Sequence, residues 1–314
     1  MPAPRVVVVI TVLCGGVGAA KMLAALSLAV DERTICGIVN TGDDLTMHGL
    51  RICPDIDTIT YTLAGLNNNE LGWGLADETW RVMDELGALG GDNWFRLGDR
   101  DLATHLYRSQ RLAEGASLSL VTAELLARRG VRLALLPVSE DPLATVFSTR
   151  DRGRLSFQEY FVRERHAVVV EAVDVRGADL ATPAPGVLDT IREAERIVIS
   201  PSNPLISIAP ILAVPGVRSA LAARRDDVIA VSPLIGGRAL KGPADRLLEE
   251  LGHGATNAAI ASIYSGIVGT LVIDRADAAD EEGIVATGVR CLIADTLMDG
   301  AERSKALARL LLDA

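Results

Sequence analysis

The chain has 314 residues, and its composition, 49% hydrophobic with 23% charged, is that of a globular protein long enough for one large α/β domain. Its formal net charge of -10 argues against nucleic acid and anionic membranes as partners, because clustered Lys and Arg bind both of these. No apolar stretch is long enough to cross a bilayer, and the four scattered cysteines indicate reduced thiols, so we expect a cytoplasmic protein.

The first elements along the chain predict a βαβ unit. Residues 6–13 form a continuous apolar run rich in β-branched side chains, which is typical of a strand buried on both faces of a parallel sheet. A glycine turn follows, and residues 19–26 are rich in Ala and Leu, which favour a helix. A second strand is predicted at 34–40.

Strand-like and helix-like segments alternate along the rest of the chain. Strands are predicted at residues 132–137, 166–170, 196–200, 227–232 and 290–294. Helices are predicted at residues 80–89, 102–109, 119–129, 244–251 and 257–264. The alternation indicates an α/β fold with a doubly wound, mostly parallel Rossmann-like sheet. We expect one domain over residues 1–314, with an inserted helical lobe at about 66–130.

A glycine-rich turn joins the first predicted strand to the first predicted helix. It contains Gly15, Gly16 and Gly18. Glycine permits positive φ and the close approach of a ligand, and the N–H groups at a helix N-terminus bind phosphate. The pattern is neither a complete dinucleotide fingerprint nor a P-loop. By itself it fits a nucleotide-phosphate site or a simple tight turn.

Four carboxylates lie on two segments that follow the second predicted strand. Asp43 and Asp44 come at the carboxyl end of that strand, where open α/β sheets bind ligands, and Asp55 and Asp57 follow soon afterwards. Hard oxygen ligands suit Mg²⁺ that is bound together with a substrate phosphate. The alternative is that these residues form an Asx-turn and cap a helix beginning near Thr58.

Further candidates are polar or aromatic residues in loops. Ser202 and Asn203 follow a predicted strand and suit recognition of a nucleobase, ribose or phosphate, unless Asn203 only bonds its own backbone. Trp94 could stack on a planar ligand or belong to the core of the lobe. Arg100 and His105 are candidates for an anion clamp and a polar contact.

A series of segments occurs in an order that one known family shares. They are N-T-G-D-D at 40–44, C-P-D-I-D-T at 53–58, G-W-G at 72–74, E-T-W at 78–80 and W-F-R-L-G-D-R-D-L-A-T-H at 94–105. F-Q-E-Y-F-V at 157–162, S-P-S-N-P at 200–204 and K-G-P-A at 241–244 extend the match over most of the chain. In these segments the chain resembles the 2-phospho-L-lactate transferase family of coenzyme F420 biosynthesis.

The resemblance implies a Mg²⁺-dependent transferase that forms a homodimer. The enzyme would move a phospholactyl or phosphoenolpyruvyl group from a guanylylated three-carbon acid to the ribityl hydroxyl of the deazaflavin Fo. The products would be coenzyme F420-0, or its dehydro form, and GMP. The resemblance leaves open whether the donor carries phospholactate, phosphoenolpyruvate or phosphoglycerate.

The resemblance also implies roles for particular residues. We expect the nucleotide phosphates to be lined by Gly15, Gly16, Gly18 and Lys21. We expect the metal to be bound by Asp43 and Asp57, and catalysis to involve Asp43, Asp44 and Arg100. Other ligand contacts are expected from Thr41, Asp55, Trp94, His105, Ser202 and Asn203. One departure is Ala19, where the family usually has glycine, and its methyl group could tighten the turn or crowd the nucleotide.

Two other interpretations compete with this one. The first is a nucleotide-sugar-binding regulator of related fold without transferase activity, but the 94–105 segment belongs to the transferase pattern. The second is an NAD(P)-binding oxidoreductase. Its glycine fingerprint is incomplete here, and Asn40 stands where a ribose-binding acid would be expected.

Overall fold

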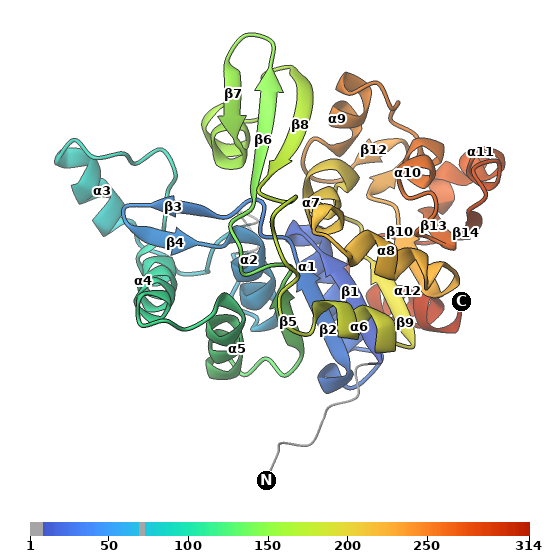
Figure 1. The fold of residues 1–314 in the computed structure, drawn as a ribbon, viewed down its shortest axis with the longest axis horizontal. Helices are drawn as coiled ribbons and strands as arrows, with labels where there is room; N and C mark the ends of the chain where they lie inside the picture. Colours follow the sequence, from blue (N-terminus) through green and yellow to red (C-terminus); the bar gives the residue numbers. More distant parts are fainter. Residues whose placement is uncertain (1–8, 69–72) are drawn as a thin grey trace.

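The computed structural model describes residues 9–68 and 73–314, and its centre is a seven-stranded sheet in which all pairings are parallel (Figure 1). The spatial order is β14-β13-β10-β9-β1-β2-β5. These strands are β1 (Ile10–Cys14), β2 (Ile35–Val39), β5 (Ala134–Pro137), β9 (Arg196–Ile199), β10 (Val228–Val231), β13 (Thr270–Asp274) and β14 (Arg290–Ala294). The α/β prediction is confirmed; residues 6–8 of the first predicted strand, and Gly72, lie outside the described residues.

Helices cover both faces of this sheet because successive strand side chains point to opposite faces. Leu13 and Ile199 belong to one core cluster, and Val12 and Val198 belong to the other. The first cluster packs under α6 (Val187–Glu193), α7 (Ala209–Ala213), α8 (Val217–Ala222), α10 (Asn257–Ile263) and α11 (Glu281–Val285). The second packs under α1 (Gly16–Ser27), α2 (Pro54–Leu63), α5 (Leu118–Arg128) and α12 (Ala301–Asp313).

The order in which strands are added to the sheet reverses between β1 and β9. It runs from β1 to β2 and β5 on one side, and later returns to place β9 on the other side of β1. The Ser200 hydroxyl donates to the Leu13 carbonyl (2.7 Å), and the Ser202 hydroxyl donates to the Gly15 carbonyl (2.6 Å). The turn after β1 and the loop after β9 are therefore held together at the point where such sheets bind ligands.

The stretch 66–130 contains helices that lie beside the sheet (Figure 1). They are α3 (Arg81–Ala88), α4 (Asp99–Ala113) and α5, and the hairpin β3 (Leu45–Met47) and β4 (Leu50–Ile52) packs on α4. The helix predicted at 102–109 is longer than expected at both ends. Asp99 and Asp101 occupy its first turn, where carboxylates are favoured by the helix dipole.

An antiparallel sheet was missed by the sequence analysis. It contains β6 (Ala144–Thr149), β7 (Gly153–Ser156) and β8 (Val170–Arg176), and it projects from one end of the molecule (Figure 1). The strand predicted at 166–170 was wrong: His166 has φ +44°, and β8 begins only at Val170. The apolar run before Val170 was interpreted as a core strand, although these residues lead into a half-exposed one.

The remaining elements are short. They are the hairpin β11 (Leu234–Ile235) and β12 (Arg238–Ala239), and the helix α9 (Ala244–Glu250). The strand β13 was also missed, whereas the predicted strands of the main sheet after residue 33 and the predicted helices after residue 118 agree with the structure within two residues. Among the described residues, no helix is long and apolar enough to cross a membrane.

Candidate active site

A cavity of about 720 Å³ lies at the carboxyl edge of the parallel sheet. One wall is formed by residues that follow β1, β9, β10 and β14, namely 15–18, 201–203, 232–233 and 296–298. The opposite wall comes from α2, the 94–105 segment and residues 157–162. The position is the one expected for a ligand site in an open α/β sheet, and the volume suits a nucleotide-sized molecule.

The glycine turn forms part of this first wall. Its glycines are required by the local structure for different reasons. A Cβ on Gly15 would lie 2.5 Å from Ser207 Cβ, and a Cβ on Gly18 would lie 2.3 Å from the Pro201 carbonyl oxygen. These two glycines therefore allow the turn to pack against the loop after β9. Gly16 has φ +66°, which favours glycine, and its N–H donates to Asp55.

Ala19 does not affect the cavity. Its side chain is fully buried in the core cluster under α1 and is absent from the cavity wall. The expectation that its methyl group crowds a nucleotide was therefore wrong, because the methyl fills the interface between helix and sheet. Lys21, two residues further along α1, is exposed and lies on the cavity wall.

Asp43 and Asp55 form a buried pair on the wall, and no cation of the described residues neutralises either carboxylate. Asn40 Nδ2 donates to Asp55 Oδ2 (3.0 Å), and Thr145 Oγ1 donates to Asp43 Oδ1 (3.3 Å). Burial raises the pKa of Asp43, and the charge of Asp55 raises it further. Burial also raises the pKa of Asp55, to about 7. The pair is a concentration of negative charge that lacks a counter-ion.

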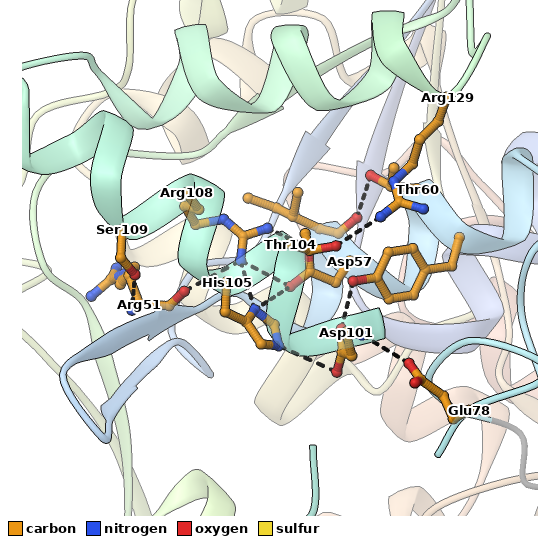
Figure 2. Close-up of polar contacts among 12 residues, drawn as sticks. Arg51, Asp57, Thr60, Glu78, Asp101, Thr104, His105, Arg108, Ser109 and Arg129 are labelled. Atoms are coloured by element: carbon orange, nitrogen blue, oxygen red, sulfur yellow. Dashed lines mark hydrogen bonds and ion pairs between the residues drawn. The ribbon is translucent and has the colours of Figure 1, made fainter. Parts of the chain in front are cut away.

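Asp57 lies in a very different setting, a buried network between α2 and α4 (Figure 2). The fully buried Arg108 donates from Nη1 to Asp57 Oδ2 (3.1 Å) and from Nη2 to Asp57 Oδ1. Arg108 Nη1 also lies 3.2 Å from His105 Nδ1, and His105 Nε2 lies 3.2 Å from Asp101 Oδ2. The Tyr61 hydroxyl donates to Asp101 Oδ1 (2.5 Å). Each acid of this network has a partner.

The network also determines the tautomer of His105. A guanidinium group only donates hydrogen bonds, so His105 Nδ1 accepts from Arg108 and the ring proton is on Nε2, facing Asp101. The ring is almost completely buried, with a side-chain exposure of 1%, although it forms part of the cavity wall. His105 therefore contributes to a rigid wall beneath the cavity.

The structure does not bring Asp44, Arg100 or Thr41 to the cavity wall. Asp44 pairs with Arg51 (2.9 Å), and burial raises its pKa to about 6. The exposed Arg100 donates to the Ala76 carbonyl (2.6 Å). Neither Asp44 nor Arg100 faces the cavity. The catalytic roles expected of them stay predictions.

The capping alternative is not what the structure shows. Helix α2 begins at Pro54 rather than near Thr58, and its N-cap residue, Cys53, makes no side-chain capping bond. Asp55 and Asp57 lie inside the first turn, where they are favoured by the helix dipole. The Asx-type contact belongs to Asn40 instead, whose Oδ1 accepts from the Gly42 N–H (2.8 Å).

In the loop after β9, some polar side-chain atoms are hydrogen-bonded within the protein and one is free. Asn203 Oδ1 accepts from the Leu205 N–H (2.9 Å), which is the local bond considered as the alternative. Asn203 Nδ2, however, has no hydrogen-bond partner among the described residues, and Asn203 lies on the cavity wall. Ser202 is also on the wall but is committed to the Gly15 carbonyl.

Aromatic side chains line the cavity on the side away from the sheet. Trp73, Trp94 and Phe95 come from the helical lobe, and Phe157 and Phe161 come from the segment beside β7. Phe157 and Phe161 stack with ring centroids 5.3 Å apart. The sequence analysis identified Trp94 as a site residue and missed the two phenylalanines.

Other missed wall residues follow strand ends or the missed sheet. Ser232 and Thr296 come after β10 and β14, a position that alone could have marked them. Gln158 donates from Nε2 to the Asp43 carbonyl (3.0 Å) and so ties the antiparallel sheet region to the acid pair. Gln158 belongs to the 157–162 segment that carries the family resemblance, but no local pattern reveals this contact, which spans 115 positions.

The carboxylates of Asp43 and Asp55 are the candidate ligands for a metal ion. Within the described part of the chain, no group of three or more His, Cys, Asp and Glu side chains is arranged to hold a metal ion. Asp43 and Asp55 do not form a closed structural site. Two carboxylates without a counter-ion do fit Mg²⁺, which typically keeps several waters and takes its other ligands from substrate phosphates.

Comparison with known proteins identifies the family. The family model described as 2-phospho-L-lactate transferase CofD matches residues 10–295. A phosphoenolpyruvate transferase of Streptomyces griseus is 44% identical over 309 residues, which cover 97% of each chain. One of Kitasatospora aureofaciens is 46% identical over 308 residues, which cover 96% of this chain and 95% of that one.

A solved structure shows the same fold at lower similarity. A UPF0052-family protein of Bacillus halodurans superposes with a TM-score of 0.63 and 18% identity, covering 97% of this chain and 98% of that one. It supports the fold alone. Because the family model covers most of the chain and the relatives match it from end to end, the chain belongs to the 2-phospho-L-lactate transferase CofD family.

Proposed function

We propose that the protein transfers a phosphoenolpyruvyl or phospholactyl group from a guanylylated donor to the ribityl hydroxyl of the deazaflavin Fo. The products are coenzyme F420-0, or its dehydro form, and GMP. The observation that carries this proposal is the uncompensated Asp43 and Asp55 pair, which lies beside the glycine turn in a cavity with an aromatic wall. The relatives are named phosphoenolpyruvate transferases, which favours the enolpyruvyl donor.

The glycine turn and α1 suit the diphosphate of the donor. The Gly16 N–H donates to Asp55. The N-cap residue Gly15, however, offers no side chain to the Val17 and Gly18 N–H groups of α1, so these two are available to an anion. Lys21 supplies a positive charge on the same wall, and Asn203 supplies a free amide donor. Together they offer hydrogen-bond donors where the acids alone would repel phosphate.

The aromatic wall suits the acceptor. A deazaflavin is planar and largely apolar, and stacking on aromatic rings is the usual way to bind such a molecule. Trp94, Phe157 and Phe161 present such rings on the wall of the same cavity as the glycine turn. An acceptor bound there would direct its ribityl chain toward Asp43 and Asp55.

The transfer forms one bond and breaks one. The acceptor hydroxyl oxygen bonds to the phosphorus that carries the three-carbon acid, the bond from this phosphorus to the bridging oxygen breaks, and GMP leaves. The hydroxyl proton passes to a water molecule, because both acids of the pair are proposed to bind the metal. Mg²⁺ held by Asp43 and Asp55 would neutralise phosphate charge. We assign Asp55 to this role instead of Asp57, whose two oxygens bind Arg108.

The direct test is product analysis by mass spectrometry. Purified protein is incubated with Mg²⁺, Fo and either guanylylated phosphoenolpyruvate or guanylylated phospholactate. We expect a phosphodiester-linked deazaflavin whose mass identifies the donor, with one GMP released per product. Failure to bind or modify Fo, together with tight binding of a UDP-sugar, would contradict the proposal and support a nucleotide-sugar-binding regulator.

A further inference from the structure

The chain has only three lysines, and two of them, Lys21 and Lys241, line the cavity. The third, Lys305, lies on α12 and is not on the cavity wall. Among the residues that the structure describes, none forms a hydrogen bond or ion pair with Lys241. In a chain of net charge -10, a lysine left without an acidic partner at a ligand cavity is a binding group for an anion.

A rigid hairpin carries Lys241 to the cavity. Strands β11 and β12 pair directly across Gly236 and Gly237, whose φ values are +62° and +71°. Two positive φ values define a type I′ turn, the two-residue loop that matches the twist of a hairpin. Leu234, at the base, is fully buried in the core. The hairpin therefore fixes the position of the first residues after β12, the segment that carries Lys241.

Asp277 fixes the tip of this hairpin by two hydrogen bonds. Its Oδ2 accepts from the Gly236 N–H (3.0 Å), and its Oδ1 accepts from the Gly237 N–H (2.7 Å). The Asp277 residue is 93% buried, since its exposure is 7%, and it lies just after β13. A carboxylate with both oxygens on consecutive backbone N–H groups fixes the orientation of the turn.

The segment after the hairpin is shaped for a ligand. Leu240 lines the cavity although 61% of it is exposed, and Lys241 beside it is exposed too. Gly242 has φ +73°, and a Cβ on it would lie 3.8 Å from Phe161 Cζ, on the aromatic wall. An apolar side chain and a free lysine of this segment thus line the cavity.

We propose that Lys241 is a second phosphate-binding residue for the donor, and that Asp277 is a positioning residue that holds the hairpin carrying it. This inference rests on the proposed function, because it takes the donor to be a diphosphate ester. Lys21 from α1 and Lys241 from the segment after the hairpin then both bind the diphosphate. Each supplies a charge-assisted hydrogen bond, the stronger class of hydrogen bond.

The test is isothermal titration calorimetry with GDP and, as a second probe, inorganic pyrophosphate. Lys241→Met is expected to raise the Kd for GDP by roughly tenfold or more, the size of a lost charged hydrogen bond. Guanosine, which lacks phosphate, should bind equally to both proteins. Lys241→Arg should recover most of the affinity, and Lys305→Met is the matched control with wild-type affinity. GDP binding by Lys241→Met that equals wild type overturns the role of Lys241.

Asp277 is tested by non-additivity. Asp277→Asn should raise the Kd for GDP several-fold in the wild-type background and leave it unchanged in the Lys241→Met background. An equal effect in both backgrounds overturns the positioning role. Should Asp277→Asn not fold, Gly237→Ala loosens the same turn, because alanine disfavours φ +71° and meets no steric neighbour there.

The two proposals fail in different ways. If wild type binds pyrophosphate but not GDP, the guanylylated donor is wrong, and Lys241 is judged by the effect of its substitutions on pyrophosphate binding. If wild type binds GDP and Lys241→Met binds it equally, only the inference on Lys241 is wrong. If wild type binds neither probe, both are wrong.

Discussion

Asp55 and Asp57 lie two positions apart in the first turn of α2, yet their surroundings are opposite. Asp57 binds a fully buried arginine through both oxygens, whereas Asp55 faces Asp43 and has no cationic partner among the described residues. One carboxylate is therefore part of the framework, and the other carries unneutralised charge into the cavity. The comparison shows that the counter-ion, rather than the residue type, distinguishes a structural acid from a ligand-binding one.

Removing the uncompensated pair should have the largest effect. Asp43→Asn and Asp55→Asn should each lower kcat on the order of 100- to 1,000-fold, because each removes a metal-binding charge at the reacting phosphate. Steady-state measurement of GMP release checks this. Asp189→Asn, an exposed carboxylate on α6, is the matched control and should retain wild-type turnover. Near-normal turnover in Asp55→Asn would remove it from the catalytic site.

Breaking the paired acid should instead reduce stability. Arg108→Met leaves Asp57 buried without a partner, at a cost of about 3–5 kcal/mol in the free energy of unfolding. Adding Asp57→Asn should restore part of the loss. Urea denaturation measures both. Arg192→Met removes an exposed pair with Asp189 and should cost less than about 1 kcal/mol, so equal losses at the two sites would contradict the comparison.

The pH dependence of stability should report on Asp55. Its pKa of about 7 in the folded chain lies above the value of about 3.9 in unfolded chains. The folded state then binds the proton more tightly, so this contribution to stability is complete below about pH 4 and is lost as the pH rises to about 7, by at most about 1.4 kcal/mol per pH unit.

Thermal unfolding of wild type and Asp55→Asn in metal-free buffer isolates this contribution. We expect the wild-type midpoint to fall relative to Asp55→Asn over that pH range, and Mg²⁺ to reverse the fall more at pH 8 than at pH 5. Parallel pH profiles of the two proteins would show that Asp55 is not perturbed.

The smallest effect is expected at the edge of the paired network. Tyr61→Phe removes the hydroxyl that donates to Asp101, and should cost about 1 kcal/mol in the free energy of unfolding. Chemical denaturation checks the value. A loss as large as that of Arg108→Met would mean that the network depends on Tyr61 more than on the ion pair.

The main sheet was predictable from the sequence because its strands are continuous apolar runs. β1, β2, β9, β10 and β14 were all found in this way, and the cavity lies at their carboxyl ends. The antiparallel sheet was missed because β6, β7 and β8 are only partly buried and carry polar residues on one side. Phe157 and Phe161 of the cavity wall, which follow β7, were missed for the same reason.

Within the site, the sequence marked the correct loops but not the partners. The pairing of Asp57 with Arg108 spans 51 positions and joins two helices, so no local pattern reveals it. The same is true of Asp277, which lies 40 positions from Gly237 and is recognised only through its bonds. Local motifs identified where carboxylates gather, and tertiary contacts decided which of them are free.

Binding of Mn²⁺, measured by electron paramagnetic resonance on wild type, Asp55→Asn and Asp57→Asn, tests the central claim most directly. The account predicts that wild type binds the ion, that Asp55→Asn loses most of this binding, and that folded Asp57→Asn keeps it. Retained binding in Asp55→Asn, with loss in folded Asp57→Asn, would show that the paired acid holds the cation and would contradict the account.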